Sequence, residues 1–368
     1  MRDGQRRWRR ALLVALALVA MQLGSLVAPA YACGCGAMVP QSGRQLSVKQ
    51  ETSAVRFDGH TEQIVMRLTV DGNAPKAAWI MPVPSRATVK LGDRRLFDQL
   101  EKLSEPVNRT RTYFWPRDGD WPFAKSRTVG DGAPNAAAKP PVEVVGRERL
   151  GPFDVARLTA TDPTALRDWL SRNGFRLPPA LATELRPYVD QKWEYVAIRL
   201  APDQPGQTLG GPLDPLSLTF ASDRLIYPMR LSRLAKTPQT LNLYVLANHR
   251  METTSPIGGA APETLFAGRI DHPSDSLADL VGRDDPVYLT TLTQYFQHPS
   301  EITGDHELRA SADDTPFQRA WYTDELMTVG GIPAWLLTVG GVLVPLGVGA
   351  GLAVRARTRR RATGLTPL

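Results

Sequence analysis

The sequence predicts an α+β fold: mixed or mostly antiparallel sheets, a few short helices and a C-terminal transmembrane helix. Three observations support this fold class. Segments with the two-residue alternation of strands recur through the chain, only a few segments have helical spacing, and Ile332–Val354 has no charged residue. Proline makes up 31 of 368 residues. Because the usual share is about 5%, we expect short elements joined by many loops.

The first elements are two strands and a helix. Gln63–Val70 alternates apolar and polar residues and ends at a turn, which is typical of a half-buried strand. Ala77–Val83 follows as a second strand, in which Pro82 suits an edge position or the strand's end. Arg95–Ser104 places leucines and a phenylalanine on one face, and Pro106 lies just beyond its end.

The segment 106–141 is the most loop-like part of the chain. Its aromatic half contains Trp115, Trp121 and Phe123, which are candidates for a partner-binding surface. The alternative is an irregular loop that packs these rings onto the core, where large aromatic side chains usually lie.

The middle of the chain predicts helices between strands. A helix capped at Asp162, with Pro163 in its first turn, should end at Asn173-Gly174. A second helix should begin at Pro178-Pro179. We expect strands before, between and after these features at 142–149, 153–158, 193–200, 216–220, 225–231 and 241–247. Helices are predicted at 287–296 and, from a Thr315 cap, at 317–326.

The N-terminus has the pattern of a secretory signal. Five arginines precede an apolar stretch at 11–28, and Ala30-Tyr31-Ala32 is an A-x-A cleavage site, so the mature chain should begin at Cys33. An uncleaved signal anchor is the alternative, because the apolar stretch is long.

The uncharged run Ile332–Val354 is 23 residues long. As a helix it reaches about 35 Å, enough to cross a hydrocarbon core of about 30 Å with some tilt. The five arginines at 355–361 should then stay in the cytoplasm. We therefore predict a signal peptide at 1–32, an extracytoplasmic domain at 33–331 with a subdomain break within 106–141, a transmembrane helix at 332–354 and a basic tail at 355–368.

Topology accounts for the net charge of +7. Ten arginines and one acid lie in the two terminal segments, so residues 33–331 contain 34 basic and 36 acidic side chains. This near-neutral region has no basic cluster to neutralise phosphates, and we expect no nucleic-acid partner.

Cys33 and Cys35 are the only cysteines, and both are predicted to lie in an oxidising compartment. A strained bond between them, an intermolecular bridge and two thiols are all compatible with this spacing. Within the apolar run, Gly347 and Gly351 form a G-x-x-x-G pair that would let two helices pack closely, although glycine is common in such helices for other reasons.

Catalytic, metal and cofactor signatures are missing from the sequence. It has no H-E-x-x-H and no G-x-S-x-G, and the Gly34/Gly36 pair lacks the context of a dinucleotide fingerprint. The five histidines are scattered at His60, His249, His272, His298 and His306. We predict no metal site, no cofactor and no catalytic residue.

Several ordered segments resemble a known bacterial family. They are Cys33-Gly34, Ala78–Pro84, Gly151–Ala156, Leu166–Phe175, Tyr188–Ala197 and Ile226–Leu231. In these segments the chain resembles domain of unknown function 2330. The resemblance implies a secreted or membrane-anchored protein of unassigned activity, and it supplies no catalytic residues. The Cys-x-Cys start is more compact than the cysteine spacing of that family.

Topology and the missing catalytic motifs favour a non-enzymatic, single-pass protein of the cytoplasmic membrane. Its exported domain would bind another envelope component or serve as a structural module. The alternative is an extracytoplasmic enzyme of hydrolase type, whose site the fold assembles from dispersed residues. A deep pocket gathering His60, His249, Asp223 and Arg230 would favour the enzyme, and a shallow surface would favour binding.

Overall fold

The computed structural model describes residues 35–117, 120, 153–159, 163–202, 204, 206–283 and 285–362. The chain divides into two compact units. The sandwich unit comprises residues 1–105 and 146–319, and the anchor unit comprises residues 106–145 and 320–368.

A nine-stranded sheet forms the larger part of the sandwich unit. In spatial order its strands are β17 (Phe317–Gln318), β14 (Glu263–Ile270), β15 (Val287–Phe296), β12 (Gln239–Ala247), β2 (Leu46–Phe57), β3 (Thr61–Gly72), β10 (Leu216–Ala221) and β5 (Thr88–Leu91), with β9 (Gly211–Pro212) also paired to β3. Only β2 and β12 run parallel, and every other pair in this sheet is antiparallel.

Two smaller sheets complete the unit. The antiparallel four-stranded sheet has the order β1 (Ala37–Pro40), β4 (Ala77–Val83), β8 (Glu194–Leu200) and β7 (Phe153–Thr159). The three-stranded sheet has the order β11 (Leu225–Tyr227), β16 (His306–Ala310) and β13 (Met251–Thr253). The described residues of this unit form the helices α2 (Arg94–Leu103), α3 (Pro163–Arg172), α4 (Pro179–Asp190) and α5 (Asp275–Val281), with short 3-10 turns η1 (Arg230–Leu234) and η2 (Pro299–Glu301).

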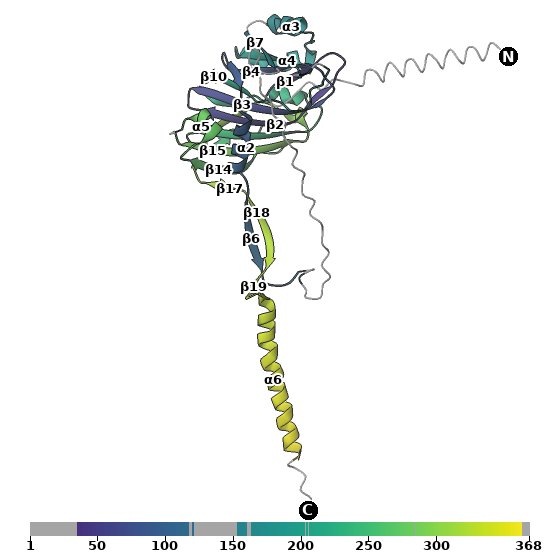
Figure 1. The fold of residues 1–368 in the computed structure, drawn as a ribbon, viewed down its shortest axis with the longest axis vertical. Helices are drawn as coiled ribbons and strands as arrows, with labels where there is room; N and C mark the ends of the chain where they lie inside the picture. Colours follow the sequence, from purple (N-terminus) through teal and green to yellow (C-terminus); the bar gives the residue numbers. More distant parts are fainter. Residues whose placement is uncertain are drawn as a thin grey trace, which may run out of the picture. The chain divides into compact units, whose positions relative to one another are not determined.

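Strand alternation arranges these elements in four layers. Val55 of β2 and Trp79 of β4 belong to one apolar core between the two larger sheets. Ala54, the neighbour of Val55, faces the opposite way, toward α2 and α5. Ile80, the neighbour of Trp79, faces α3 and α4. Because successive strand residues point to opposite faces, the order is helices, sheet, sheet, helices (Figure 1).

Local sequence explains the helix ends. The Asp93 carboxylate caps α2 by accepting the backbone N–H of Arg95 at 2.9 Å. Helix α3 ends as the sequence predicts, at Asn173-Gly174: Gly174 has φ +80°, and the N–H of Phe175 donates to the carbonyl of Leu170 at 2.8 Å.

The predicted α+β class is confirmed, but two predicted helices are wrong. Residues 287–296 form strand β15, whose side chains are buried on both faces between β12 and β14, so the apolar run shows no clear alternation. Residues 317–326 form strands β17 and β18 (Ala320–Leu326). There the Thr-Pro pair resembled a helix start, while β18 pairs with a strand more than 200 residues away in sequence.

Two other local predictions need correction. Part of the segment predicted as loop, Val107–Tyr113, is strand β6. In the segment expected to be strand through residue 231, the strand stops at Tyr227 and η1 follows. The predicted strand at 142–149 lies outside the described residues. Pro82 sits beyond the end of β1, where β4 pairs only with β8, as its missing N–H requires.

The anchor unit combines a two-stranded ribbon with a long helix. Strands β6 and β18 run parallel, and Arg117 forms an ion pair with Asp324 at 2.5 Å. The hairpin of β19 (Thr328–Val329) and β20 (Ile332–Pro333) leads into α6 (Ala334–Ala362). The segment Ala334–Arg359 is long and apolar enough to cross a membrane. Helix α6 begins at Ala334, two residues after the start of the predicted span 332–354. It continues past the end of that span through the arginines at 355–361.

Glu62 and His306 are among the ionisable side chains buried in the sandwich unit. Glu62 in β3 accepts the backbone N–H of Ile226 through Oε2 at 3.2 Å, and its Oε1 has no partner among the described residues. Burial raises its pKa well above the ordinary 4.5. His306 faces Gln294, whose Oε1 lies 2.7 Å from Nε2, and burial lowers its pKa to about 4. Burial therefore disfavours the charged form of both groups, and His306 is uncharged at neutral pH.

Replacing the acid with its neutral isostere, Glu62→Gln, should stabilise the protein above pH 5. The Glu62 carboxyl ionises near pH 4.5 in the unfolded chain, whereas burial raises its pKa in the folded chain. Wild-type stability therefore falls as the pH rises from 4.5 to the folded-state pKa, by about 1.4 kcal/mol for each unit by which that pKa is raised. Thermal unfolding should show equal melting temperatures near pH 4 and a higher one for the variant at pH 8. Equal melting temperatures at both pH values would contradict the shift.

The buried His306 makes stability fall as the pH falls, opposite in direction to the effect of Glu62, and His306→Gln should remove this dependence. The unfolded histidine takes up a proton near pH 6.5 and the folded one only near pH 4, so the wild type should lose up to about 3 kcal/mol between those values. The variant should lack this loss, because glutamine does not titrate. Denaturant unfolding at pH 7 and pH 4 measures the difference, and parallel losses in both proteins would exclude His306 as its source.

Candidate functional site

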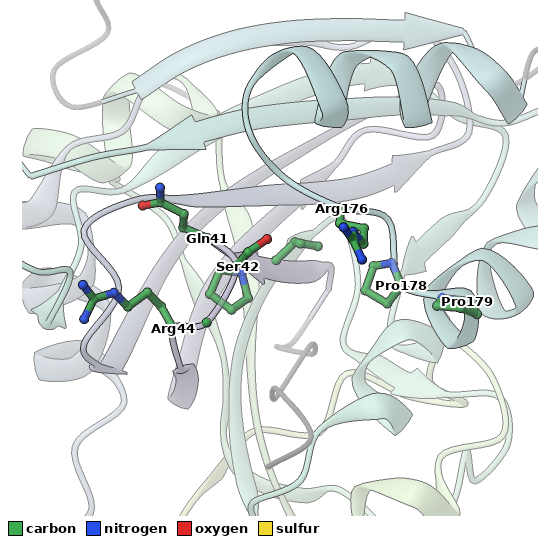
Figure 2. A pocket seen from close by; sticks show the side chains of 9 residues that line it. Gln41, Ser42, Arg44, Arg176, Pro178 and Pro179 are labelled. Carbon is green, nitrogen blue, oxygen red and sulfur yellow. The ribbon is translucent and has the colours of Figure 1, made fainter. Parts of the chain in front are cut away.

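A surface cleft lies where the β1–β2 turn meets the connection between α3 and α4 (Figure 2). Its volume is about 320 Å³. It is lined by Val39, Pro40, Gln41, Ser42, Gly43, Arg44, Arg176, Pro178 and Pro179. We call it the arginine cleft.

One wall of the arginine cleft is a tight turn. The N–H of Arg44 donates to the carbonyl of Gln41 at 3.0 Å, and Gly43 between them has φ +77°. A residue with a side chain is strained in that conformation, so glycine suits this position. The turn leaves Gln41, Ser42 and Arg44 exposed at the rim.

The other wall follows the end of α3. After the left-handed Gly174, Arg176 is exposed, and the chain then enters α4 through Pro178 and Pro179. The fixed φ of proline suits a first helical position and limits motion of this wall. Figure 2 shows Arg176 beside Pro178, while Arg44 extends outward from the opposite rim.

The cleft is electrostatically one-sided. Two guanidinium groups belong to its lining, and none of the nine lining residues is acidic. Neither Arg44 nor Arg176 forms an ion pair with a carboxylate among the described residues. Arginine presents its N–H donors in a planar fork that matches carboxylate and phosphate. The chemistry available here is the binding of an anion.

A second hollow of about 280 Å³ lies against the outer helices. Its floor is apolar, with Leu177, Leu185 and Val189, and Arg186 and Asp190 lie at its edge. It contains one acid and two arginines, so it lacks the charge bias of the arginine cleft.

The strongest polar cluster is inside the core and closed to solvent. Tyr227 donates to Glu51, and the Ser53 hydroxyl lies 2.6 Å from the Tyr227 oxygen. The backbone N–H of Cys35 lies 3.0 Å from both carboxylate oxygens of Glu51. Burial raises the pKa of Glu51 and Tyr227, although the hydrogen bonds to Glu51 oppose its shift.

This cluster cannot receive a substrate. Glu51 and Ser53 are 2% and 0% exposed, and the cavity beside Glu51 measures about 10 Å³. That space is enough for about one water molecule. The cluster therefore stabilises the fold.

The histidines do not assemble a site. His60, His249, His272 and His298 are exposed, whereas His306 is buried. His249 pairs with Asp314 at 3.0 Å. The described residues contain no group of three or more His, Cys, Asp or Glu side chains arranged to hold a metal.

Residues considered for the alternative, enzymatic hypothesis also lie apart. Asp305 accepts the Tyr188 hydroxyl at 2.6 Å and the N–H of Arg230 at 2.9 Å, so it joins α4 to η1. Asp223 is exposed on a turn after β10. None of His60, His249, Asp223 and Arg230 lines the arginine cleft or the second hollow.

The predicted partner surface and anchor-packing residues stay predictions. Trp115 is 65% exposed, and Trp121 and Phe123 lie outside the described residues. A side chain at Gly347 or Gly351 would meet nothing within 4 Å. Cys33 is also outside the described residues, so the bond between Cys33 and Cys35 stays a prediction.

No sequence pattern marks Arg44 or Arg176 as a site residue. The turn glycines at 43 and 174 are visible in the sequence, but both arginines are isolated and 132 residues apart. Only the pairing of β1 with β4, and the packing of α3 and α4 on that sheet, bring them to one cleft.

Comparisons with known proteins identify the family of this chain but indicate no function. No curated protein matches the chain. The crystal structure of baculovirus P35 is similar over 75% of this chain and 97% of that one, with 9% identity and a TM-score of 0.31. At these values the similarity supports no conclusion about function. A family model described as an uncharacterized protein conserved in bacteria (DUF2330) matches residues 29–309. The chain therefore belongs to this bacterial family, as the resemblance in the sequence implied.

Proposed function

We propose that this protein is a membrane-tethered binding module of the cell envelope. Its sandwich unit lies outside the cytoplasmic membrane and holds an anionic group of another envelope component in the arginine cleft. The module performs no chemistry on that component. Helix α6 keeps it at the membrane.

The charge of the arginine cleft carries the proposal. Arg44 and Arg176 are exposed beside a shallow hollow with no acidic residue in its lining. An anion placed there gains charge-assisted hydrogen bonds without displacing an existing ion pair. A carboxylate and a phosphate both fit the guanidinium fork.

The same geometry predicts modest affinity. Ordering an exposed arginine side chain costs up to about 2 kcal/mol, and the shallow hollow leaves a ligand partly in water. Such a site suits many weak contacts along a polymer or a crowded surface better than the capture of a single small molecule.

The ends of the chain support the orientation. Arginines follow the apolar part of α6, and positively charged residues next to a membrane helix favour the cytoplasmic side. The secretion-signal pattern at the other end supports export of the segment between them.

Anion binding is tested with Arg44→Gln/Arg176→Gln. In detergent at constant ionic strength, inorganic phosphate should raise the melting temperature of the wild type relative to chloride, because a ligand that binds only the folded state stabilises it. The double variant should lose most of that rise. Acetate in place of phosphate distinguishes a carboxylate-binding from a phosphate-binding cleft.

The matched control for this experiment is Arg172→Gln. Arg172 is an exposed arginine of α3 outside the cleft lining, where it donates to the carbonyl of Asp168 at 3.2 Å. The Arg172→Gln variant removes one charge from the same surface. Phosphate should still raise its melting temperature relative to chloride. If all three proteins respond equally to both anions, the arginine cleft is not the binding site.

Orientation is tested by adding one surface cysteine at a time to a Cys33→Ser background, in which the remaining Cys35 is buried and 1% exposed. Asp223→Cys is exposed in the sandwich unit, and Thr358→Cys lies in the arginine-rich end of α6. A membrane-impermeant maleimide should label the first in intact spheroplasts and the second only after permeabilisation. The reverse pattern would place the sandwich unit in the cytoplasm.

A further inference from the structure

Three sulfur atoms meet between the two large sheets. The Sγ atom of Cys35 lies 3.7 Å from Sδ of Met66 and 3.8 Å from Sδ of Met81. Cys35 precedes β1, Met66 belongs to β3, and Met81 belongs to β4. All three side chains are at most 1% exposed. The fold thus gathers sulfur from three separate segments at one buried point.

The spacing suits ligands of one metal ion. A metal–sulfur bond is about 2.3 Å long, which places two sulfur ligands of a trigonal ion about 4 Å apart. The distances from Sγ of Cys35 to the two methionine Sδ atoms, 3.7 Å and 3.8 Å, are slightly shorter than this. Methionine has three rotatable bonds, so small side-chain adjustments are sufficient to open the cluster around an ion.

We propose that Cys35, Met66 and Met81 bind one Cu(I) ion through a thiolate and two thioethers. Thiolate and thioether ligands are soft and select Cu(I) over the harder divalent ions. The single negative charge of the thiolate balances the single positive charge of Cu(I). The complex is then neutral as a whole, which an apolar core tolerates far better than a net charge.

The hydrogen bonds of Glu51 position the cysteine. Both carboxylate oxygens lie 3.0 Å from the backbone N of Cys35, and the Tyr227 hydroxyl donates to one of these oxygens. Such support around a ligand fixes its orientation before the ion binds. On binding, the S–H bond breaks, an S–Cu bond forms, and the proton leaves to solvent. Neither sulfur nor copper changes oxidation state.

Copper binding is measured on the full chain in detergent, in a Cys33→Ser background that leaves Cys35 as the single cysteine. Cu(I) is added under ascorbate either to the folded protein or during refolding, because the sulfur atoms are buried. After gel filtration we expect one copper per chain. X-ray absorption should show a shell of sulfur alone at about 2.3 Å.

Two variants separate the site from its surroundings. Met66→Leu/Met81→Leu preserves volume, so it should fold, and it should weaken copper binding by more than about tenfold in competition with a Cu(I) chelator. Met251→Leu changes another methionine of the same core and should bind copper as before. Melting curves confirm that both variants fold.

Two results would overturn the proposal. If neither loading route retains copper, the three sulfur atoms only pack against one another. If the double methionine variant binds copper as tightly as the wild type, the ion lies elsewhere, on Cys35 alone or on the surface.

Discussion

The central strands of the nine-stranded sheet have to bury both of their faces, and the four layers follow from this requirement. In β12, Val245 faces the inter-sheet core, and its neighbour Leu246 faces α2 and α5. Each such side chain contributes about 1.5–3 kcal/mol only if something covers it. The four-stranded sheet covers one face and two short helices cover the other. Since the four-stranded sheet is also apolar on both faces, it needs α3 and α4 in turn.

Polar groups inside this core make its register specific. Glu51 and Ser53 point inward from β2 and meet Tyr227 of β11, while Cys35 joins them from the start of the described chain. A slip of one residue in β2 would turn these groups to the opposite face and leave their partners unpaired in the core. The irregularity between Val48 and Gln50 lies just before them and sets which residues face inward. Apolar packing alone would tolerate such a slip more readily.

The fold class, most strands and three helices could be predicted because they depend on local chemistry. Asp93 caps α2, and Gly174 ends α3 in the left-handed conformation it alone adopts cheaply. Strand β15 could not be recognised in the same way, because burial on both faces removes the alternation that marks a strand. Strands β6 and β18 depend on a parallel pairing between distant segments, which no local pattern reveals.

The site was harder to predict than the fold for a related reason. A catalytic or histidine-based metal site often has a short motif, whereas Arg44 and Arg176 are ordinary surface residues until the turn and the helix connection meet. The same holds for the sulfur cluster, since Met66 and Met81 read as core residues in their strands.

The placement of ionisable groups supports the proposal of a binding role over a catalytic one. General acid–base chemistry needs a titratable group that substrate reaches and that its neighbours tune. In the described residues, Glu51, Glu62 and His306, whose pKa values are shifted by burial, are sealed in the core. The arginine cleft, in contrast, is open but has no acid or histidine in its lining. Permanent positive charge at an accessible surface attracts and orients an anion, and it transfers no proton. Under the proposed function, such a module contributes recognition, and helix α6 determines where that recognition occurs.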